Sequence, residues 1–166
     1  IRQLRLGRSN AQPITVSFWV KSSVAGTYST GMRTTSAQYS YVTEFALSAN
    51  TWTYITYTAP ALTTALSGLF EDNNGAGILL DLIVLGKQTG KATSTLNAWQ
   101  AGNKVSSTNQ VAWMDNANAT VYITGVQVEA GDTATPFEHR SYGEELALCQ
   151  RYCFVMTREG SGSNQN

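Results

Sequence analysis

The stretch ITVSFWVK, from Ile14 to Lys21, decides the fold of this chain. Its even positions are apolar and its odd positions are mostly polar, which is typical of a β-strand with one face against a core. Trp19 is the exception, because it falls on the polar side. This parity predicts that Phe18 is buried and that Trp19 faces the opposite way.

Comparable strands are predicted along the rest of the chain, separated by turns rich in Gly, Asn and Asp. The longer ones are expected at Tyr39–Leu47, Trp52–Thr58, Ile78–Leu85 and Val121–Glu129, and the shorter ones at Gln3–Leu6, Thr27–Arg33 and Gln110–Met114. Several short strands with such punctuation favour an all-β fold, a two-sheet antiparallel β-sandwich (jelly roll).

Three of these strands carry more specific expectations. The strand at Tyr39–Leu47 buries its odd positions and shows Val42 and Glu44 on the other face. The strand at Ile78–Leu85 is apolar on both sides, so we expect it to be a central strand. Trp52 begins its strand directly after a turn and is expected in the core.

One short C-terminal helix is predicted after Ser141. Ser141 and Glu144 have the spacing of a capping box, in which two side chains satisfy free amides at a helix start. Tyr142, Leu146 and the two cysteines then fall on one stripe of the helix. We expect this stripe to lie against the sandwich or against a neighbouring chain.

The chain is expected to form one domain over residues 1–157, followed by a flexible C-terminal tail at 158–166 of linker composition. It opens at Ile1, with no Met and no charged-then-apolar leader. Such a start is typical of a processed chain or an excised domain, whose upstream part would hold further strands.

The charge balance argues against two classes of partner. Eleven basic and eleven acidic residues cancel, and no basic run is present. We therefore expect no nucleic-acid or anionic-membrane binding. No apolar run approaches the roughly 20 residues that cross a bilayer, so membrane insertion is not expected either.

The two cysteines, Cys149 and Cys153, do not form a zinc pattern, because the only histidine, His139, is not suitably spaced to complete four ligands. A disulfide across one helical turn would strain the helix, so two reduced thiols are the favoured interpretation. The sequence predicts no cofactor.

A structural calcium ion would take several oxygen ligands from the loops. Glu129 with Asp132, or Asp72 with Asn73 and Asn74, would supply oxygen ligands. No calcium-loop motif accompanies them. Ordinary structural turns are therefore the preferred interpretation.

Catalytic patterns are weak. A triad needs a base, and His139 has neither a nucleophile elbow nor a spaced partner. A glycosidase pair needs two carboxyls that face each other across a cleft. No spacing creates such a pair among the available carboxylates Asp72, Asp81, Asp115 and Glu129. We therefore expect a protein that is not an enzyme, with a hydrolase as an alternative.

Sugar binding needs exposed aromatic planes for the apolar faces of the rings and polar side chains for the hydroxyls. Trp19 is the sharpest candidate, with burial under a loop or an adjacent subunit as its alternative. Glu44 would join Trp19 if their strands were neighbours. Trp99, followed by the loop residue Asn103, would form a platform, and its alternative role is to clamp the loop to the sandwich.

The end of the chain resembles a domain common in tail fibres and related virion proteins of phages and prophages. Three consecutive segments carry the likeness, namely VYITGVQVE at 121–129, AGDTATPFE at 130–138 and SYGEELALCQRY at 141–152. The upstream pieces ITVSFWVK at 14–21, NTWTY at 50–54 and WQAGNK at 99–104 fit the same pattern in the same order. The first and third of these pieces are also similar to jelly-roll carbohydrate-binding modules.

The resemblance implies a jelly-roll sandwich on the surface of a phage particle, often a trimeric fibre, with contact to a host-surface glycan and to other virion proteins. The leading hypothesis is a non-catalytic carbohydrate-binding module for host recognition, with Trp19, Glu44, Trp99 and Asn103 as its sugar contacts. The alternatives are a purely structural virion protein, such as a spacer, a trimerising domain or a decoration domain, and a polysaccharide hydrolase.

Overall fold

The alternating stretch forms β1 (Ile14–Ser22), the middle strand of a three-stranded sheet. This is seen in a computed structural model, which describes residues 4–64 and 77–150. Val16, Phe18 and Val20 are fully buried, whereas Trp19 is exposed. The parity expected for β1 is confirmed.

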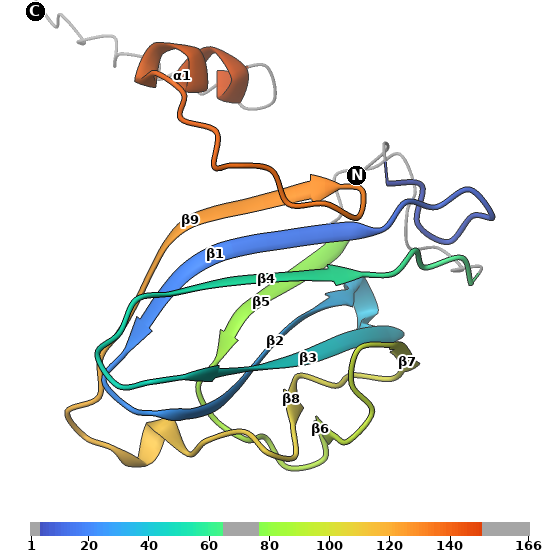
Figure 1. The fold of residues 1–166 in the computed structure, drawn as a ribbon. Coiled ribbons are helices and arrows are strands. Elements are labelled where there is room, and N and C mark those ends of the chain that lie inside the picture. Colours follow the sequence, from blue (N-terminus) through green and yellow to red (C-terminus); the bar gives the residue numbers. More distant parts are fainter. Residues whose placement is uncertain (1–3, 65–76, 151–166) are drawn as a thin grey trace, which may run out of the picture. The chain divides into compact units, whose positions relative to one another are not determined.

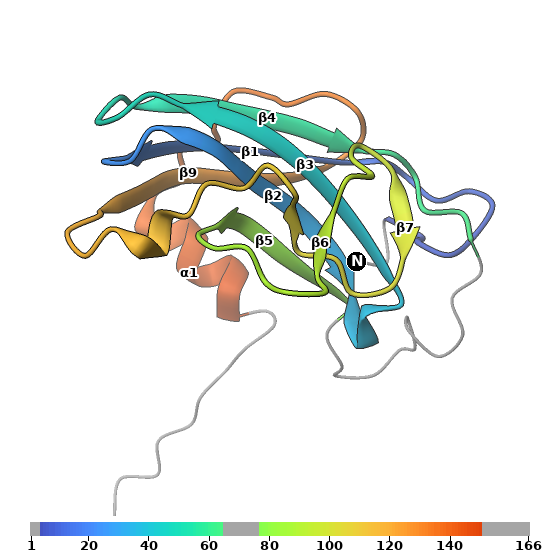
Figure 2. The same cartoon turned by 90° about the horizontal axis from the view of Figure 1, so that it is seen from below.

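Two antiparallel sheets face each other and form the sandwich (Figure 1). One has the strand order β4-β1-β9 and the other β5-β2-β3-β7, and Figure 2 shows them as separate layers. The strands after β1 are β2 (Gly26–Thr34), β3 (Tyr39–Leu47), β4 (Thr53–Ala59), β5 (Ile78–Val84), β6 (Ala92–Thr93), β7 (Trp99–Ala101), β8 (Ser106–Ser107) and β9 (Val121–Ala130). The predicted all-β sandwich is confirmed.

Aromatic rings fill the space between the sheets. Phe18 of β1 meets the edge of Phe45 of β3, and Phe45 also stacks on Tyr28 of β2. Tyr41 stacks on Tyr57 of β4 with ring centroids 6.0 Å apart. Burial raises the pKa of Tyr57 well above its ordinary value, because the phenolate would be poorly solvated.

A β-bulge changes the phase of β9. Ser17 pairs with Gln127 and Trp19 with Thr124, so β9 holds one extra residue between these pairs. Gly125 lies there with a φ of 59°, a left-handed conformation that glycine adopts without strain. The bulge keeps Val128 on the core side, opposite Val16.

The outer face of the four-stranded sheet is covered by the chain segment that carries β6 to β8. Ser107 donates its amide to Ser29 Oγ, and Lys104 donates its amide to Ser40 Oγ. This cover buries Val42, which we expected on the open side of β3. The expectation for Val42 was wrong because strand parity reports which face a residue takes, not what packs on that face.

Two other strand expectations were also wrong. The strand β5 is not central but lies at the edge of its sheet, next to β2 only. Its apolar residues on both sides are all partly exposed, and Leu79 is 43% exposed. The segment Gln110–Met114 forms no strand, because the Gln110 side chain accepts the Ser29 amide and thereby holds the segment across β2. The described part of Gln3–Leu6 is a turn.

The short helix α1 (Tyr142–Gln150) begins as predicted. Ser141 donates its amide to Glu144 Oε2, and Glu144 donates its amide to Ser141 Oγ, which is a complete capping box. The helix belongs to a unit at 135–166, separate from the sandwich unit at 1–134. No residue of α1 is buried, and docking of its apolar stripe stays a prediction.

The end of the chain is not described beyond residue 150. Cys153 and the predicted tail at 158–166 therefore lie outside the described residues, as does the loop with Asp72, Asn73 and Asn74. Cys149 is exposed and carries a free thiol. In the part of the chain that is described, no helix is long and apolar enough to cross a membrane.

Substitution of Gly31 tests the close approach of β2 to β3. A Cβ atom at this position would lie 2.0 Å from the backbone oxygen of Tyr41, so Gly31→Ala forces the two strands apart. We expect the free energy of unfolding to fall by about 3 kcal/mol in urea denaturation. The matched control is Gly143→Ala in α1, where a Cβ meets open space. Equal stability of the two variants would contradict this packing.

Candidate functional site

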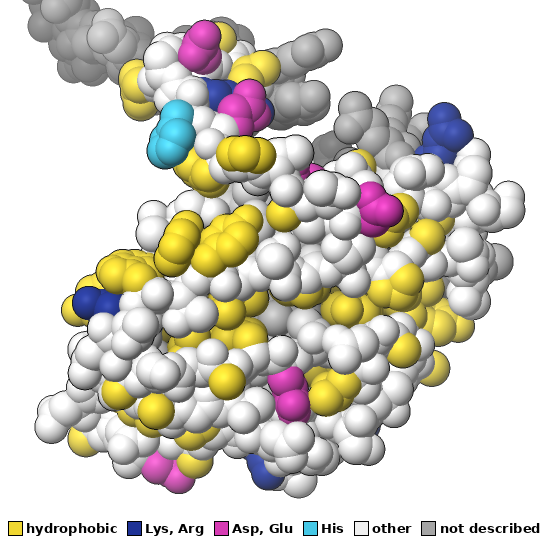
Figure 3. Space-filling view, viewed as in Figure 1, with side chains coloured by type: hydrophobic (Ala, Val, Ile, Leu, Met, Phe, Trp, Pro, Cys, Tyr) yellow, Lys and Arg dark blue, Asp and Glu magenta, His cyan; other side chains and the backbone are white. Residues whose placement is uncertain are grey.

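Four exposed aromatic side chains lie on the outer face of the three-stranded sheet. We call this cluster the aromatic face: Trp19 on β1, Trp52 just before β4, Tyr54 on β4 and Tyr122 on β9. Their exposed fractions are between 43% and 52%. Figure 3 shows hydrophobic side chains gathered over the region where β9, β1 and β4 run side by side, next to a basic side chain.

Strand register brings the cluster together. Trp19 pairs with Tyr54 of β4 on one side, and the two rings lie 5.3 Å apart between centroids with an interplanar angle of 48°. Lys21 pairs with Tyr122 of β9. Trp52 lies two residues before Tyr54 and therefore takes the same face. The aromatic face consists of two adjacent rows on a rigid sheet.

Lys21 lies between two of the rings. Its Nζ is 5.7 Å from the centroid of the Trp52 ring and 5.3 Å from the centroid of the Tyr122 ring. Both distances are within the range in which the negative face of an aromatic ring attracts a cation. These contacts hold the ammonium group in place and orient both rings.

Polar side chains continue the same face beyond the aromatic rows. Thr124 lies beside Trp19 and is exposed. Towards the other end of β1, Thr15 Oγ1 lies 2.9 Å from Thr58 Oγ1 and donates to the backbone oxygen of Gly131. The loop after β9 therefore closes this end of the face, and the aromatic end stays open.

Trp19 lies on the exposed face, as the sequence predicts, whereas Trp52 does not lie where it was expected. Trp52 is 43% exposed, so the expectation that it lies in the core was wrong. The signal was present in the alternation of β4, where Ile55, Tyr57 and Ala59 take the core side. Trp52 and Tyr54 fall on the other side, and sequence reasoning missed Tyr54 and Tyr122.

Glu44 does not join Trp19. The two residues are on β3 and β1, which belong to different sheets, so the condition for their meeting is not fulfilled. Glu44 Oε2 instead accepts a long hydrogen bond of 3.5 Å from the Asn109 side chain, and Glu44 Oε1 is buried without a hydrogen-bond partner. Glu44 faces the covering segment, on the opposite side of the sandwich from the aromatic face.

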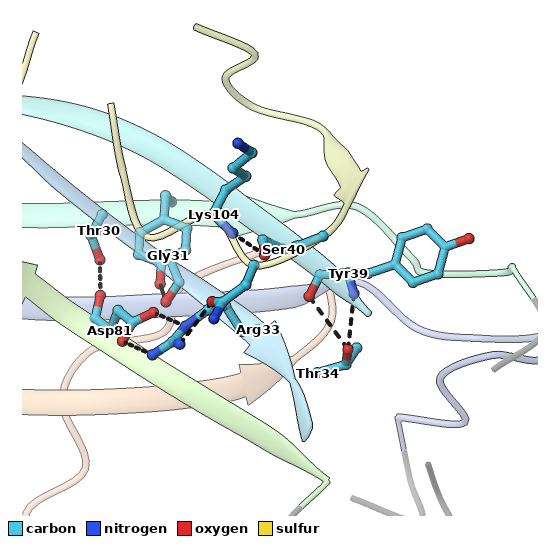
Figure 4. A network of polar contacts seen from close by, with 11 residues as sticks. Thr30, Gly31, Arg33, Thr34, Tyr39, Ser40, Asp81 and Lys104 are labelled. Atoms are coloured by element: carbon cyan, nitrogen blue, oxygen red, sulfur yellow. Dashed lines mark hydrogen bonds and ion pairs between the residues drawn. The ribbon is translucent and has the colours of Figure 1, made fainter. Parts of the chain in front are cut away.

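Asn103 belongs to a polar network on the same covered side. Arg33 donates two hydrogen bonds to the Asp81 carboxylate, at 2.7 and 2.8 Å, and a third to Asn103 Oδ1 at 3.1 Å. Figure 4 shows Arg33 and Asp81 pointing toward each other from β2 and β5. The hydrogen bonds to the Asp81 carboxylate, and to a smaller extent its charge, raise the pKa of Arg33. The network ties the loop after β7 to the sheet.

Trp99 has the contacts of a clamp. It lies on β7 opposite Tyr41, its ring is tilted against the Tyr41 ring, and its Nε1 donates to the backbone oxygen of Pro60 at 2.6 Å. Trp99 is partly buried against the core. The structure therefore does not gather the four predicted sugar contacts into one site, and Trp19 alone lies on the aromatic face.

His139 and Asp132, the candidates for catalysis and for calcium binding, have other contacts. The His139 ring packs edge-on against Phe137, with centroids 5.0 Å apart. Asp132 Oδ1 accepts a hydrogen bond from Thr133. Within residues 4–64 and 77–150, no three or more His, Cys, Asp or Glu side chains are grouped so that they would hold a metal ion.

Comparisons of the chain with models of protein families, with curated proteins and with solved structures found no match.

The loop network makes a prediction for Asp81→Asn, which removes the charge that Arg33 binds. We expect a loss of about 2 kcal/mol in the free energy of unfolding, because a half-buried guanidinium is left with weaker partners. Hydrogen exchange at the amides of Gly102 and Lys104 should accelerate. The control Asp115→Asn removes the same charge from an exposed position. Unchanged exchange in Asp81→Asn would show that the ion pair does not hold this loop.

Proposed function

We propose that this chain is a non-catalytic carbohydrate-binding module and that the aromatic face is its sugar-binding surface. The observation that carries the proposal is the exposure of four large aromatic rings on one rigid sheet face. Trp and Tyr rings bury apolar ring faces of a ligand, and their polar atoms stay available for hydrogen bonds. Neighbouring threonines, such as Thr124, are suited to contact sugar hydroxyls.

The shape of the surface favours an extended ligand. The two aromatic rows are two residues apart along β1, which corresponds to about 7 Å. A linear polysaccharide that runs along β1 would stack one ring on Trp19 and Tyr54 and the next near Trp52 and Tyr122. Since the sheet fixes these side chains before binding, little ordering entropy is lost on association.

The biological setting that we propose is the surface of a phage particle, where such a module would attach the virion to a glycan of its host. This part of the proposal is supported by the resemblance of residues 14–152 to tail-fibre domains. It agrees with a polar, neutral chain of all-β architecture. Glu44 and Asn103 enter the proposal as residues of the covered side of the other sheet, and Trp99 as the clamp between β7 and Pro60.

Substitution of Trp19 tests the proposal. We expect Trp19→Ala to weaken binding on an array of bacterial capsular and O-antigen polysaccharides at least about tenfold, because the central ring of the platform is lost. The control is Tyr142→Ala, which removes an exposed aromatic ring of α1. Circular dichroism would verify that both variants stay folded. An array without any signal for the folded wild-type chain would contradict the proposal.

A second candidate function, a structural virion subunit, is favoured by β9. Ile123 and Val128 pair with Val20 and Val16 and therefore face the core side of their sheet, yet they are 37% and 53% exposed. The strand β9 is also an edge strand of this sheet. A second copy of the chain would cover this apolar strip, as in a homotrimer.

Light scattering tests this candidate. An assembling chain should have a mass that is a multiple of 18.0 kDa. Val128→Ser should lower the measured mass towards that of a single chain, because a polar group replaces part of the buried strip. The control is Val126→Ser, which makes the same exchange in the bulge of the same strand, at a residue without a partner on β1. A stable monomer at high protein concentration would argue against a subunit interface on β9.

A further inference from the structure

Lys21 places a positive charge within the aromatic face. Its Nζ is held over the rings of Trp52 and Tyr122, and its own side chain is half-buried between them. Among the described residues, Lys21 forms no ion pair with a carboxylate, in contrast to Arg33 and Arg140. An ammonium group with three donors is therefore held on the surface that we propose to bind sugar.

The environment of Lys21 makes this charge effective for a ligand. The cation is fixed by two rings and by the pairing of β1 with β9, so its position does not depend on a flexible loop. Aromatic rings offer it no hydrogen-bond acceptor of the strength of a carboxylate. A bound anion would keep the contacts with both rings and add a charge-assisted hydrogen bond.

We infer that the ligand of the aromatic face is an acidic glycan, in which a sugar stacks on Trp19 and Tyr54 and a carboxylate of the same or the next residue binds Lys21 Nζ. The inference rests on the proposed function and names the class of sugar. The spacing of the rows, about 7 Å, matches a substituent one position along a chain from the stacked ring. Uronic acids have this chemistry.

A membrane surface is the other anionic partner to consider. Recognition of acidic lipids takes clusters of four to eight basic side chains. The aromatic face has Lys21 as its cation, and the chain as a whole is neutral. One fixed cation beside stacking rings suits one carboxylate on a sugar far better than a charged bilayer.

The test uses bacterial capsular and O-antigen polysaccharides, immobilised in pairs as the native polymer and as the same polymer after reduction of its carboxylates to alcohols. We expect the folded wild-type chain to bind native uronic-acid polymers at least about tenfold more tightly than their reduced forms, because reduction removes one charge-assisted contact. Added salt should weaken the native interaction and leave the reduced one unchanged.

Three variants separate the outcomes. Lys21→Gln should lose the preference for the native polymer, so that this variant binds the native and the reduced polymer equally. Trp19→Ala should lose both, and Lys87→Gln should lose neither, because it removes one exposed positive charge on a loop after β5. Equal binding of native and reduced polymers, unaffected by Lys21→Gln, would overturn the inference and leave the proposed function intact.

Two further results are decisive. Failure of every polymer to bind the folded chain would overturn the proposed function, and this inference with it. The wild-type chain could instead bind vesicles that contain phosphatidylserine, lose this binding in Lys21→Gln, and show no preference for native over reduced polymer. That result would assign the charge to a membrane contact and overturn the inference of an acidic glycan.

Discussion

The pairing of β1 with both β4 and β9 is the constraint on which the rest of the structure depends. It fixes which side chains look inward, because each residue of β1 pairs with a residue of the same orientation on β4, on β9 or on both. Phe18 is thereby committed to the core, where it meets Phe45 of the other sheet. The same register forces Trp19, Tyr54 and Lys21 outward. One set of backbone hydrogen bonds thus determines the core and the candidate binding surface together.

Much of the fold was predictable because period-two alternation is local information. The strands at Ile14–Lys21 and Tyr39–Leu47 were predicted with nearly their observed bounds, and the capping box at Ser141 was predicted from its spacing alone. The place of a strand within its sheet was not predictable in this way. For β5, apolar residues on both sides suggested a centre, whereas the observed edge position depends on pairings between distant segments.

The candidate site was predictable only in part, for the same reason. Trp19 was found because its own strand reveals its parity. Tyr54 and Tyr122 belong to the site only through the register of β4 and β9 against β1, which no single segment encodes. Glu44 and Asn103 had suitable chemistry, but the covering segment uses them for its own hydrogen bonds. The four-stranded sheet is covered on its outer face and the three-stranded sheet is not. This difference decides where the candidate site lies, and it arises from tertiary packing.

The bulge at Gly125 has a consequence for how this surface can change. Before the bulge, β9 contributes Tyr122 and Thr124 to the outward side, and after it the outward residues are Gln127 and Glu129. The two halves of the strand are out of phase, so exchanges in one half leave the other half's orientation untouched. A single strand therefore works as two separately adjustable segments, one at the aromatic end and one at the hydroxyl-rich end, without any change in the strands that support them.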